Sequence, residues 1–245
     1  MEQYDDQVYE KELTNYFNVQ YYGTLYIGSQ LEDMTFIFDT GSSWFWAPTV
    51  DCLDCHKSEK YDPSLSSTYQ KLSDTPIYVG YGTGSAYGLL SAEQACLEKD
   101  QKTCVDLKML SVVQNTGLEG LDADGLMGMA PSNQDTQAKI YIEELYNAGI
   151  VSEQVFGFYL SATEPCKLTL GGYDPNFGLG VPSNQTITWN KLVDDNYWSV
   201  NLHAASLGDY KVPLSTKRAI VDTGTSYLLL PSYDFDDFIL YFSDQ

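Results

Sequence analysis

Residues 37–45, "IFDTGSSWF", place an aspartate directly behind an apolar run that begins at Thr35. Small and hydroxyl-bearing residues and a glycine follow Asp39, a composition that favours a turn. Buried strands seldom end in a carboxylate without a reason. One Asp-Thr-Gly triplet by itself nevertheless predicts a plain turn more readily than a catalytic group.

A second copy of this pattern changes the interpretation. Residues 219–226, "AIVDTGTS", repeat the order of apolar residues, Asp-Thr-Gly, a hydroxyl residue and serine, and Asp222 follows Asp39 by 183 residues. Two copies, each behind a buried-strand signature and about one domain length apart, are hard to obtain by chance. They predict a duplicated lobe in which each copy contributes one carboxylate to a shared cleft.

Most of the chain reads as short strands between turns rich in Gly, Asn, Asp and Ser. Such stretches include "NVQYYGTLYIG", "MTFIFDTG", "PIYVGYGTG", "VFGFYL", "CKLTLGG" and "YWSVNL". Residues 137–150 predict a helix, because similar residues recur at four-residue spacing and Gly149 provides a C-terminal stop. A second helix is expected over residues 232–242. The predicted fold class is therefore all-β with minor helices.

The charge balance narrows the possible functions. The 245 residues include 13 basic and 34 acidic residues, which gives a formal net charge of −21. Such a field repels nucleic-acid phosphates and anionic membrane surfaces, so no nucleic-acid partner is expected. Self-repulsion falls in acid, where carboxylates are protonated, so the composition suits work at low pH as well as simple solubility. No window of 18 apolar residues predicts a membrane span, and the polar N-terminus does not resemble a signal peptide.

The cysteines indicate an oxidising compartment. The pairs Cys52–Cys55 and Cys96–Cys104 enclose polar, turn-like residues, which predicts two short disulfide loops. Cys166 is left over. The triplet that starts at Asn184 is a glycosylation sequon, and it supports a secretory route only weakly, because such triplets often occur by chance.

Further landmarks give the chain a resemblance to the pepsin-like aspartic proteases. Residues 81–88, "YGTGSAYG", resemble that family's flap hairpin, and residues 124–130, "DGLMGMA", resemble the apolar-apolar-Gly strand that crosses behind the first aspartate. Trp46 stands where the family has its flap-supporting tryptophan. The helix followed by "GIVSEQVFGFYLS", then "LTLGGYD" and "WNKLVDDNYWSVNL", continue in the family's order across nearly the whole chain.

The resemblance implies a bilobal acid-protease fold, with an N-terminal lobe at residues 1–160 and a partial C-terminal lobe at residues 161–245. It implies an aspartic endopeptidase that uses no cofactor and no metal and acts as a monomer on peptide or protein substrates. The expected location is secreted or lysosomal/vacuolar.

The chain also departs from the family pattern. The Cys52–Cys55 loop is shorter than usual, and no cysteine pair precedes Asp222. If the second lobe repeats the first, its own apolar-apolar-Gly strand should lie about 85 residues beyond Asp222, past the last residue of the sequence. The chain is therefore expected to be a fragment or a truncated product, with poorly covered apolar residues at 228–230 and 238–241.

The chemistry explains why two carboxylates are needed. Hydrolysis of an amide without a covalent intermediate requires a base that activates water and an acid that polarises the carbonyl group. Two adjacent carboxylates cannot both ionise comfortably, so they share one proton and can supply both functions. This is the established behaviour of the aspartic-protease dyad, and the resemblance assigns it to Asp39 and Asp222. The sequence does not say which of them carries the proton.

Residues next to each aspartate are expected to support the pair: Thr40, Gly41 and Ser42 in the first copy, and Thr223, Gly224 and Thr225 in the second. The glycines let backbone N–H groups approach the carboxylates. The threonines that follow each aspartate are expected to bond across the lobes, and the later hydroxyls to bond the outer carboxylate oxygens. Local turn capping is the alternative for these hydroxyls.

The predicted flap has a flexible tip that contains Gly82 and Thr83. An extended substrate can pair with backbone groups there, and closure expels water from the dyad. Tyr81 is expected to cover the S1 side of the cleft, hydrogen-bonded to Trp46. An ordinary surface hairpin is the plainer alternative.

Other interpretations rest on single motifs. "CLDCH", which ends at His56, matches a haem-attachment pattern and could suggest zinc, but a disulfide loop suits this position of an all-β chain better. A Ser-His-Asp hydrolase is disfavoured because neither His56 nor His203 lies in a nucleophile motif. Aspartyl-phosphate enzymes have a lysine between Asp and Thr that is absent here, and glycosidases usually place their carboxylates in unlike environments. The main alternative is a related protein that binds peptides without cleaving them.

Overall fold

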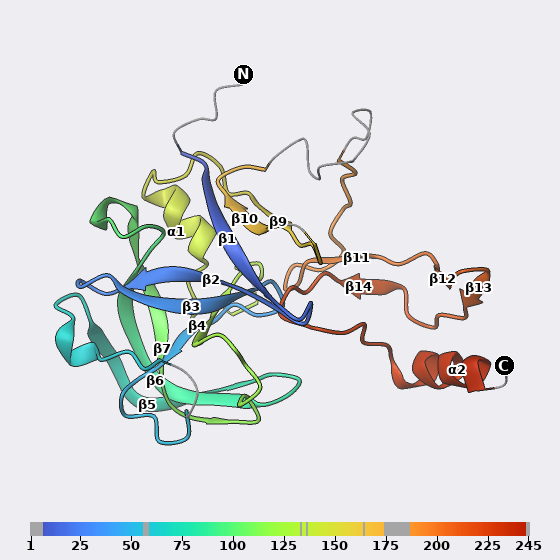
Figure 1. Ribbon diagram of the computed structural model, residues 1–245, viewed down its shortest axis with the longest axis horizontal. Helices are drawn as coiled ribbons and strands as arrows, with labels where there is room; N and C mark the ends of the chain where they lie inside the picture. The colour runs from blue at the N-terminus through green and yellow to red at the C-terminus, as the bar shows by residue number, and fades with distance from the viewer. Residues whose placement is uncertain are drawn as a thin grey trace.

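The computed structural model describes residues 7–55, 59–132, 134–135, 137–163, 165–173 and 187–243. Strands dominate these residues and the α-helices are few and short, so the predicted all-β class is confirmed (Figure 1). In chain order the elements are β1 (Tyr9–Tyr16), β2 (Gln20–Ile27), β3 (Glu32–Asp39), β4 (Phe45–Pro48), β5 (Gln70–Gly80), β6 (Ser85–Cys96), β7 (Cys104–Thr116), β8 (Gly125–Gly128), α1 (Tyr141–Asn147), β9 (Phe156–Tyr159), β10 (Cys166–Leu170), β11 (Ser199–Asn201), β12 (Ala205–Leu207), β13 (Tyr210–Val212), β14 (Arg218–Ile220) and α2 (Ser232–Ser243).

A ten-stranded sheet forms the body of the described chain, in the order β5-β6-β7-β4-β8-β3-β2-β1-β10-β9. Most neighbours are antiparallel, but β3 runs parallel to β8 and β4 runs parallel to β7. The β3–β8 pair places Asp39 beside Gly128, so the "DGLMGMA" strand lies next to the strand that carries the first aspartate. The hairpin predicted as the flap joins β5 to β6.

Strand β3 carries Asp39 into the interior because its last residues are covered on both faces. Phe36 and Phe38 belong to one buried apolar cluster, whereas Ile37 belongs to a second cluster that also holds Trp46. A shift of one residue would turn each of these side chains toward the wrong cluster, so the packing fixes the register of the strand. The register in turn fixes the position of Asp39.

The helix predicted over residues 137–150 is confirmed with shorter bounds, since α1 begins only at Tyr141. The preceding residues form turns around Asp135, which accepts hydrogen bonds from the backbone N–H groups of Gln137 and Ala138. Gly149 has φ +70°, the left-handed conformation that glycine favours after a helix. The second predicted helix is confirmed as α2.

Beyond residue 187 the described chain forms two small sheets, β11–β14 and β12–β13, and α2 lies far from the main body (Figure 1). A lobe boundary after residue 160 would separate β9 from β10, yet these strands pair in the ten-stranded sheet. Strand β10 also pairs with β1, so this sheet extends to Leu170. The division into lobes at residue 160 stays a prediction.

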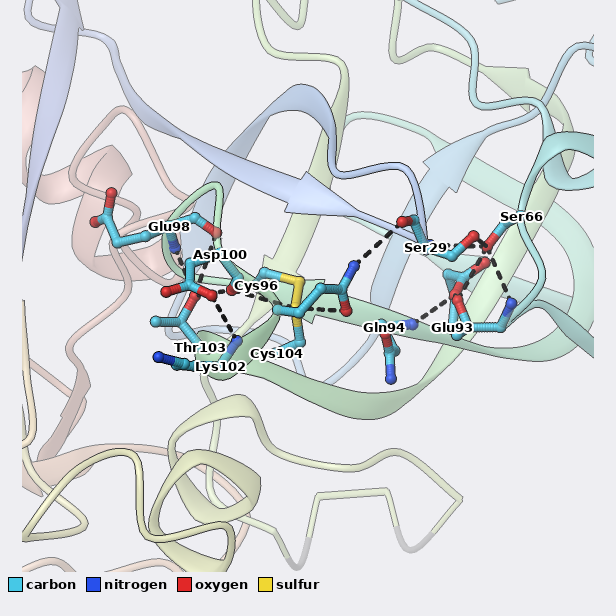
Figure 2. Close-up of a disulfide and its surroundings, with 12 residues drawn as sticks. Ser29, Ser66, Glu93, Gln94, Cys96, Glu98, Asp100, Lys102, Thr103 and Cys104 are labelled. Carbon is cyan, nitrogen blue, oxygen red and sulfur yellow. Dashed lines mark hydrogen bonds between the residues drawn. A yellow bond between two sulfur atoms is a disulfide. The ribbon is translucent and has the colours of Figure 1, made fainter.

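Both predicted disulfide loops are closed, by Cys52–Cys55 and by Cys96–Cys104. The second bond joins the end of β6 to the start of β7, and the Thr103 hydroxyl group is hydrogen-bonded to backbone atoms of the intervening loop (Figure 2). Cys166 is buried outside both disulfides, and the predicted glycosylation site, Asn184, lies outside the described residues. Within the part of the chain that the structure describes, no helix is long and apolar enough to cross a membrane.

The segment after the second Asp-Thr-Gly copy presents apolar side chains to solvent. Leu228 is 97% exposed and Leu229 is 76% exposed, while Leu230 is half-buried. Contiguous exposed apolar residues mark surfaces that associate with another molecule or with a second copy of the chain.

Replacement of Leu228 and Leu229 by serine should therefore reduce self-association of residues 1–245, because it replaces exposed apolar side chains with polar ones. Sedimentation velocity over a range of protein concentrations measures this. Leu53→Ser is the control, since Leu53 is also exposed but lies in the short Cys52–Cys55 loop. An unsubstituted chain that stays monomeric and unfolds cooperatively would contradict the expectation.

Candidate active site

Asp39 lies at the end of β3 and is only 5% exposed. The backbone N–H of Gly41 donates to Asp39 Oδ1 at 2.8 Å, and the Ser42 hydroxyl group donates to Asp39 Oδ2. The turn after the strand therefore supplies one backbone donor and one hydroxyl donor to the carboxylate. These two hydrogen bonds fix its orientation.

Asp222 has the same local arrangement, just after β14. The backbone N–H of Gly224 donates to Asp222 Oδ1 at 2.8 Å, and the Thr225 hydroxyl group donates to Asp222 Oδ2 at 2.6 Å. The two copies of the motif thus form equivalent turns.

The two turns are joined by reciprocal hydrogen bonds between threonines. The backbone N–H of Thr223 donates to Thr40 Oγ1 at 2.9 Å, and the backbone N–H of Thr40 donates to Thr223 Oγ1 at 3.1 Å. Each hydroxyl group then donates to a carbonyl group of the opposite strand, Thr40 to Val221 at 2.8 Å and Thr223 to Phe38 at 2.5 Å. Both hydroxyl groups serve as donor and acceptor, so the threonines hold the two loops in one relative position.

Glycine permits the close approach of the two loops. A Cβ atom at Gly41 would collide with the Asp222 carboxyl group, and a Cβ atom at Gly224 would collide with that of Asp39. Each carboxyl group therefore lies against the loop of the other, and the negative charge of Asp222 acts on Asp39. The structure thus brings together both aspartates and all six neighbouring residues named from the sequence.

The environment of the pair raises the pKa of Asp39 from its ordinary value to about 6. Burial of the carboxyl group is the main cause, and the negative charge of Asp222 adds to it. Hydrogen bonds from Ser42 and Gly41 act in the opposite direction. Asp39 can therefore hold a proton under mildly acidic conditions, in which an exposed aspartate would be ionised.

The hairpin between β5 and β6 lines the same cleft as the pair. Tyr81 at its tip accepts a hydrogen bond from Trp46 Nε1 at 2.8 Å, and its backbone N–H closes the turn onto the carbonyl group of Gly84 at 2.7 Å. Burial, together with the negative charge of Asp39, raises the pKa of the Tyr81 hydroxyl group, which stays neutral. At Gly82 no atom would lie within 4 Å of an added Cβ, so the tip faces open space.

A cleft of about 690 Å³ runs between these parts of the structure. Its lining includes both aspartates, and it includes Tyr81, Gly82 and Thr83 of the hairpin. Ile37, Leu118 and Leu121 add apolar surface. These three were not identified from the sequence, because a single apolar residue carries no signal that distinguishes a cleft wall from a core.

The wall of the cleft that contains Trp44 and Asp135 was also not predicted from the sequence. Trp44 Nε1 donates to Asp135 Oδ2 at 3.0 Å, and the Gln134 side chain donates to the carbonyl oxygen of Gly41 at 3.0 Å. These bonds tie the segment after β8 to the loop of the first aspartate. In the sequence, the only feature that could have pointed to this contact is that Trp44 closely follows Asp39.

Cofactor sites suggested by single motifs are not supported. Cys52 and Cys55 are bonded to each other, which leaves neither thiol for haem or zinc, and His56 lies outside the described residues. Among the residues that the structure describes, no group of three or more His, Cys, Asp and Glu side chains could hold a metal ion.

Comparison with known proteins agrees with this geometry. Residues 20–242 match the family described as "Eukaryotic aspartyl protease". The match covers most of the chain, so the chain belongs to this family, and the resemblance to pepsin-like proteases is confirmed.

The similar proteins include two pepsins and a chymosin. Pepsin A of Gallus gallus is 33% identical over 225 residues, which cover 89% of this chain and 60% of that protein. Pepsin-3 of Oryctolagus cuniculus is 32% identical over 233 residues, with 93% and 59% covered. Chymosin of Bos taurus is 30% identical over 236 residues, with 91% and 58% covered. The chain thus spans about three fifths of the length of these relatives.

The raised pKa of Asp39 predicts how stability depends on pH. In the unfolded chain Asp39 loses its proton near pH 4, whereas in the folded protein it does so at about pH 6. Between these values the folded state binds more protons, so the free energy of unfolding should fall as pH rises and then level off above about pH 6.

Asp39→Asn cannot titrate, so its stability relative to the unsubstituted chain should rise by roughly 2–3 kcal/mol between pH 4 and pH 6.5. Denaturant unfolding at several pH values measures this difference. The exposed Asp106 of β7 provides the control, Asp106→Asn. A difference between Asp39→Asn and the unsubstituted chain that stays constant with pH would contradict the assignment.

Proposed function

We propose that Asp39 and Asp222 form the catalytic pair of an aspartic endopeptidase, which hydrolyses peptide bonds in acid without a covalent intermediate. The observation that carries this function is the close approach of each carboxyl group to the loop of the other, with each oriented by one backbone and one hydroxyl donor. Similarity to proteins named pepsin and chymosin supports the same reaction class.

In the proposed reaction one carboxylate is the base and the other, protonated, is the acid. The base takes a proton from water as the water oxygen attacks the scissile carbonyl carbon, and the acid donates its proton to the carbonyl oxygen. In the second step the newly protonated carboxyl group donates to the amide nitrogen, the other carboxylate takes a proton from the diol, and the C–N bond breaks. The pair ends with one shared proton, as it began.

The neighbouring residues have supporting roles in this proposal. Thr40 and Thr223 hold the loops together, and Gly41 and Gly224 supply backbone donors without blocking the opposite carboxyl group. Ser42 and Thr225 orient the outer carboxylate oxygens. Donors fixed before the reaction stabilise charge at little cost in reorganisation, which is a large source of catalysis.

The hairpin is proposed to close over the substrate. Tyr81, Gly82 and Thr83 line the cleft, and the hydrogen bond from Trp46 holds the tyrosine over the pair. An extended peptide can pair with hairpin backbone groups as an added strand, and closure excludes water from the reacting bond. The apolar lining suits apolar side chains beside the cleaved bond.

The cellular location, the oligomeric state and the glycosylation of the protein are part of the same proposal. Disulfides form in oxidising compartments, and a shared proton requires acid, so we expect a secreted or lysosomal/vacuolar enzyme. For the active enzyme, as distinct from residues 1–245 alone, we expect a monomer with two lobes that meet at the pair, divided near residue 160, and glycosylation at Asn184.

A peptide-binding protein that does not cleave is the second candidate. The observation that favours it is the exposure of Tyr227, Leu228 and Leu229, which directly follow the loop of the second aspartate. A loop without packed neighbours on that side would hold Asp222 less firmly. Binding of peptides without hydrolysis would distinguish this function from the first.

Replacement of either aspartate tests the catalytic function. Asp39→Asn and Asp222→Asn should each reduce kcat/KM for a peptide with apolar residues at the cleaved bond by about 10³-fold or more, because the pair loses a proton acceptor or donor. The assay is cleavage of that peptide at pH 3–5 by the full-length protein.

The control Asp106→Asn removes a similar charge from the outside of β7 and should keep full activity. Retention of full activity by either dyad variant would rule out the paired mechanism. An unsubstituted protein that binds the peptide but leaves it intact would support the second candidate.

A further inference from the structure

The charge of the described cleft lining is entirely negative. Its charged side chains are Asp39, Asp135 and Asp222, and no lysine, arginine or histidine is among the lining residues. Two of these carboxylates belong to the proposed catalytic pair. Asp135 has no role in that chemistry, and beyond its bonds to Trp44 and to the turn before α1 it adds a third negative charge to the cleft.

The Asp135 carboxylate is oriented by uncharged donors. Trp44 Nε1 donates to Oδ2 at 3.0 Å, and the backbone N–H of Gln137 donates to Oδ1 at 2.8 Å. The nearest lysine along the chain, Lys139, instead pairs with Glu144 at 3.1 Å. Asp135 takes part in none of the ion pairs found among the described residues. Each of its oxygens retains a lone pair for a further donor.

Asp135 lies within reach of a substrate in the cleft. Trp44, which holds it, is five residues beyond Asp39 on the same loop, and the adjacent Gln134 is bonded to the carbonyl oxygen of Gly41. An extended chain advances about 3.3 Å per residue, so five residues span at most about 17 Å. Asp135 lines the same cleft as both aspartates, so a substrate that extends about five residues to either side of the cleaved bond is long enough to sample this part of the cleft.

We infer that Asp135 forms a subsite for a cationic side chain, so that the substrates are peptides with lysine or arginine within about five residues of the cleaved bond; this inference rests on the proposed function. A carboxylate held in place by Trp44 presents a fixed negative charge, and hydrogen bonds between charged groups are stronger than those between neutral ones. The net charge of −21 adds attraction for cationic peptides. A glutamate at the same substrate position would be repelled.

The experiment uses a set of peptides that share one cleavable apolar centre. A single position, moved through five residues on each side, carries lysine, norleucine or glutamate. The full-length protein, Asp135→Asn and the control Asp106→Asn are compared by kcat/KM. Asparagine keeps an oxygen acceptor for Trp44 and removes the charge, although its NH2 group cannot accept the hydrogen bond from the backbone N–H of Gln137.

The expected result is a preference of about threefold to tenfold for lysine over norleucine at one position. This preference should vanish in Asp135→Asn and persist in Asp106→Asn. If lysine has no advantage at any position, or if its advantage survives in Asp135→Asn, the subsite is wrong although the catalytic pair stands.

A binding measurement separates the two proposals. The same peptides, fluorescently labelled, are titrated into Asp39→Asn and into Asp39→Asn combined with Asp135→Asn. Tighter binding of the lysine peptide that depends on Asp135 supports the subsite, even if the unsubstituted protein cleaves nothing and the proposed function fails. Equal binding to both variants overturns it.

Discussion

The reciprocal hydrogen bonds between Thr40 and Thr223 are the constraint on which the rest of the site depends. Each hydroxyl group accepts from the backbone of the other loop and donates to a carbonyl group of the opposite strand. Residues 183 positions apart are thereby fixed against each other, and the preceding aspartates are brought into contact. Hydrogen bonds act over a short distance and in one direction. A small displacement of one loop would therefore break them and separate the carboxyl groups.

The proximity of the carboxyl groups explains several other features. Glycine is required two residues after each aspartate, since a side chain there would meet the opposite carboxyl group. Burial of the carboxyl group, with the charge of Asp222, raises the pKa of Asp39 to about 6. An acidic working environment would both supply the shared proton and relieve the repulsion among the 34 acidic residues.

The paired turns could be predicted from the sequence because each turn is formed by a short motif, and the motif occurs twice. The strand class and both helices also followed from local patterns, although α1 begins later than expected because Asp135 accepts turn hydrogen bonds. The wall formed by Trp44 and Asp135 could not be predicted, since its contact joins residues 91 positions apart without a motif. The pairing of β10 with β1 is likewise a tertiary contact that local periodicity does not encode.

The proposed function depends on the carboxyl group of Asp222 acting directly on that of Asp39. The most direct test is a carbon-13 NMR titration of the aspartate carboxyl groups in the unsubstituted protein and in Asp222→Asn. Asp39 should titrate at about pH 6, and at a lower pH in Asp222→Asn, where the neighbouring negative charge is gone. Titration of Asp39 near pH 4, or a value that Asp222→Asn leaves unchanged, would contradict the account.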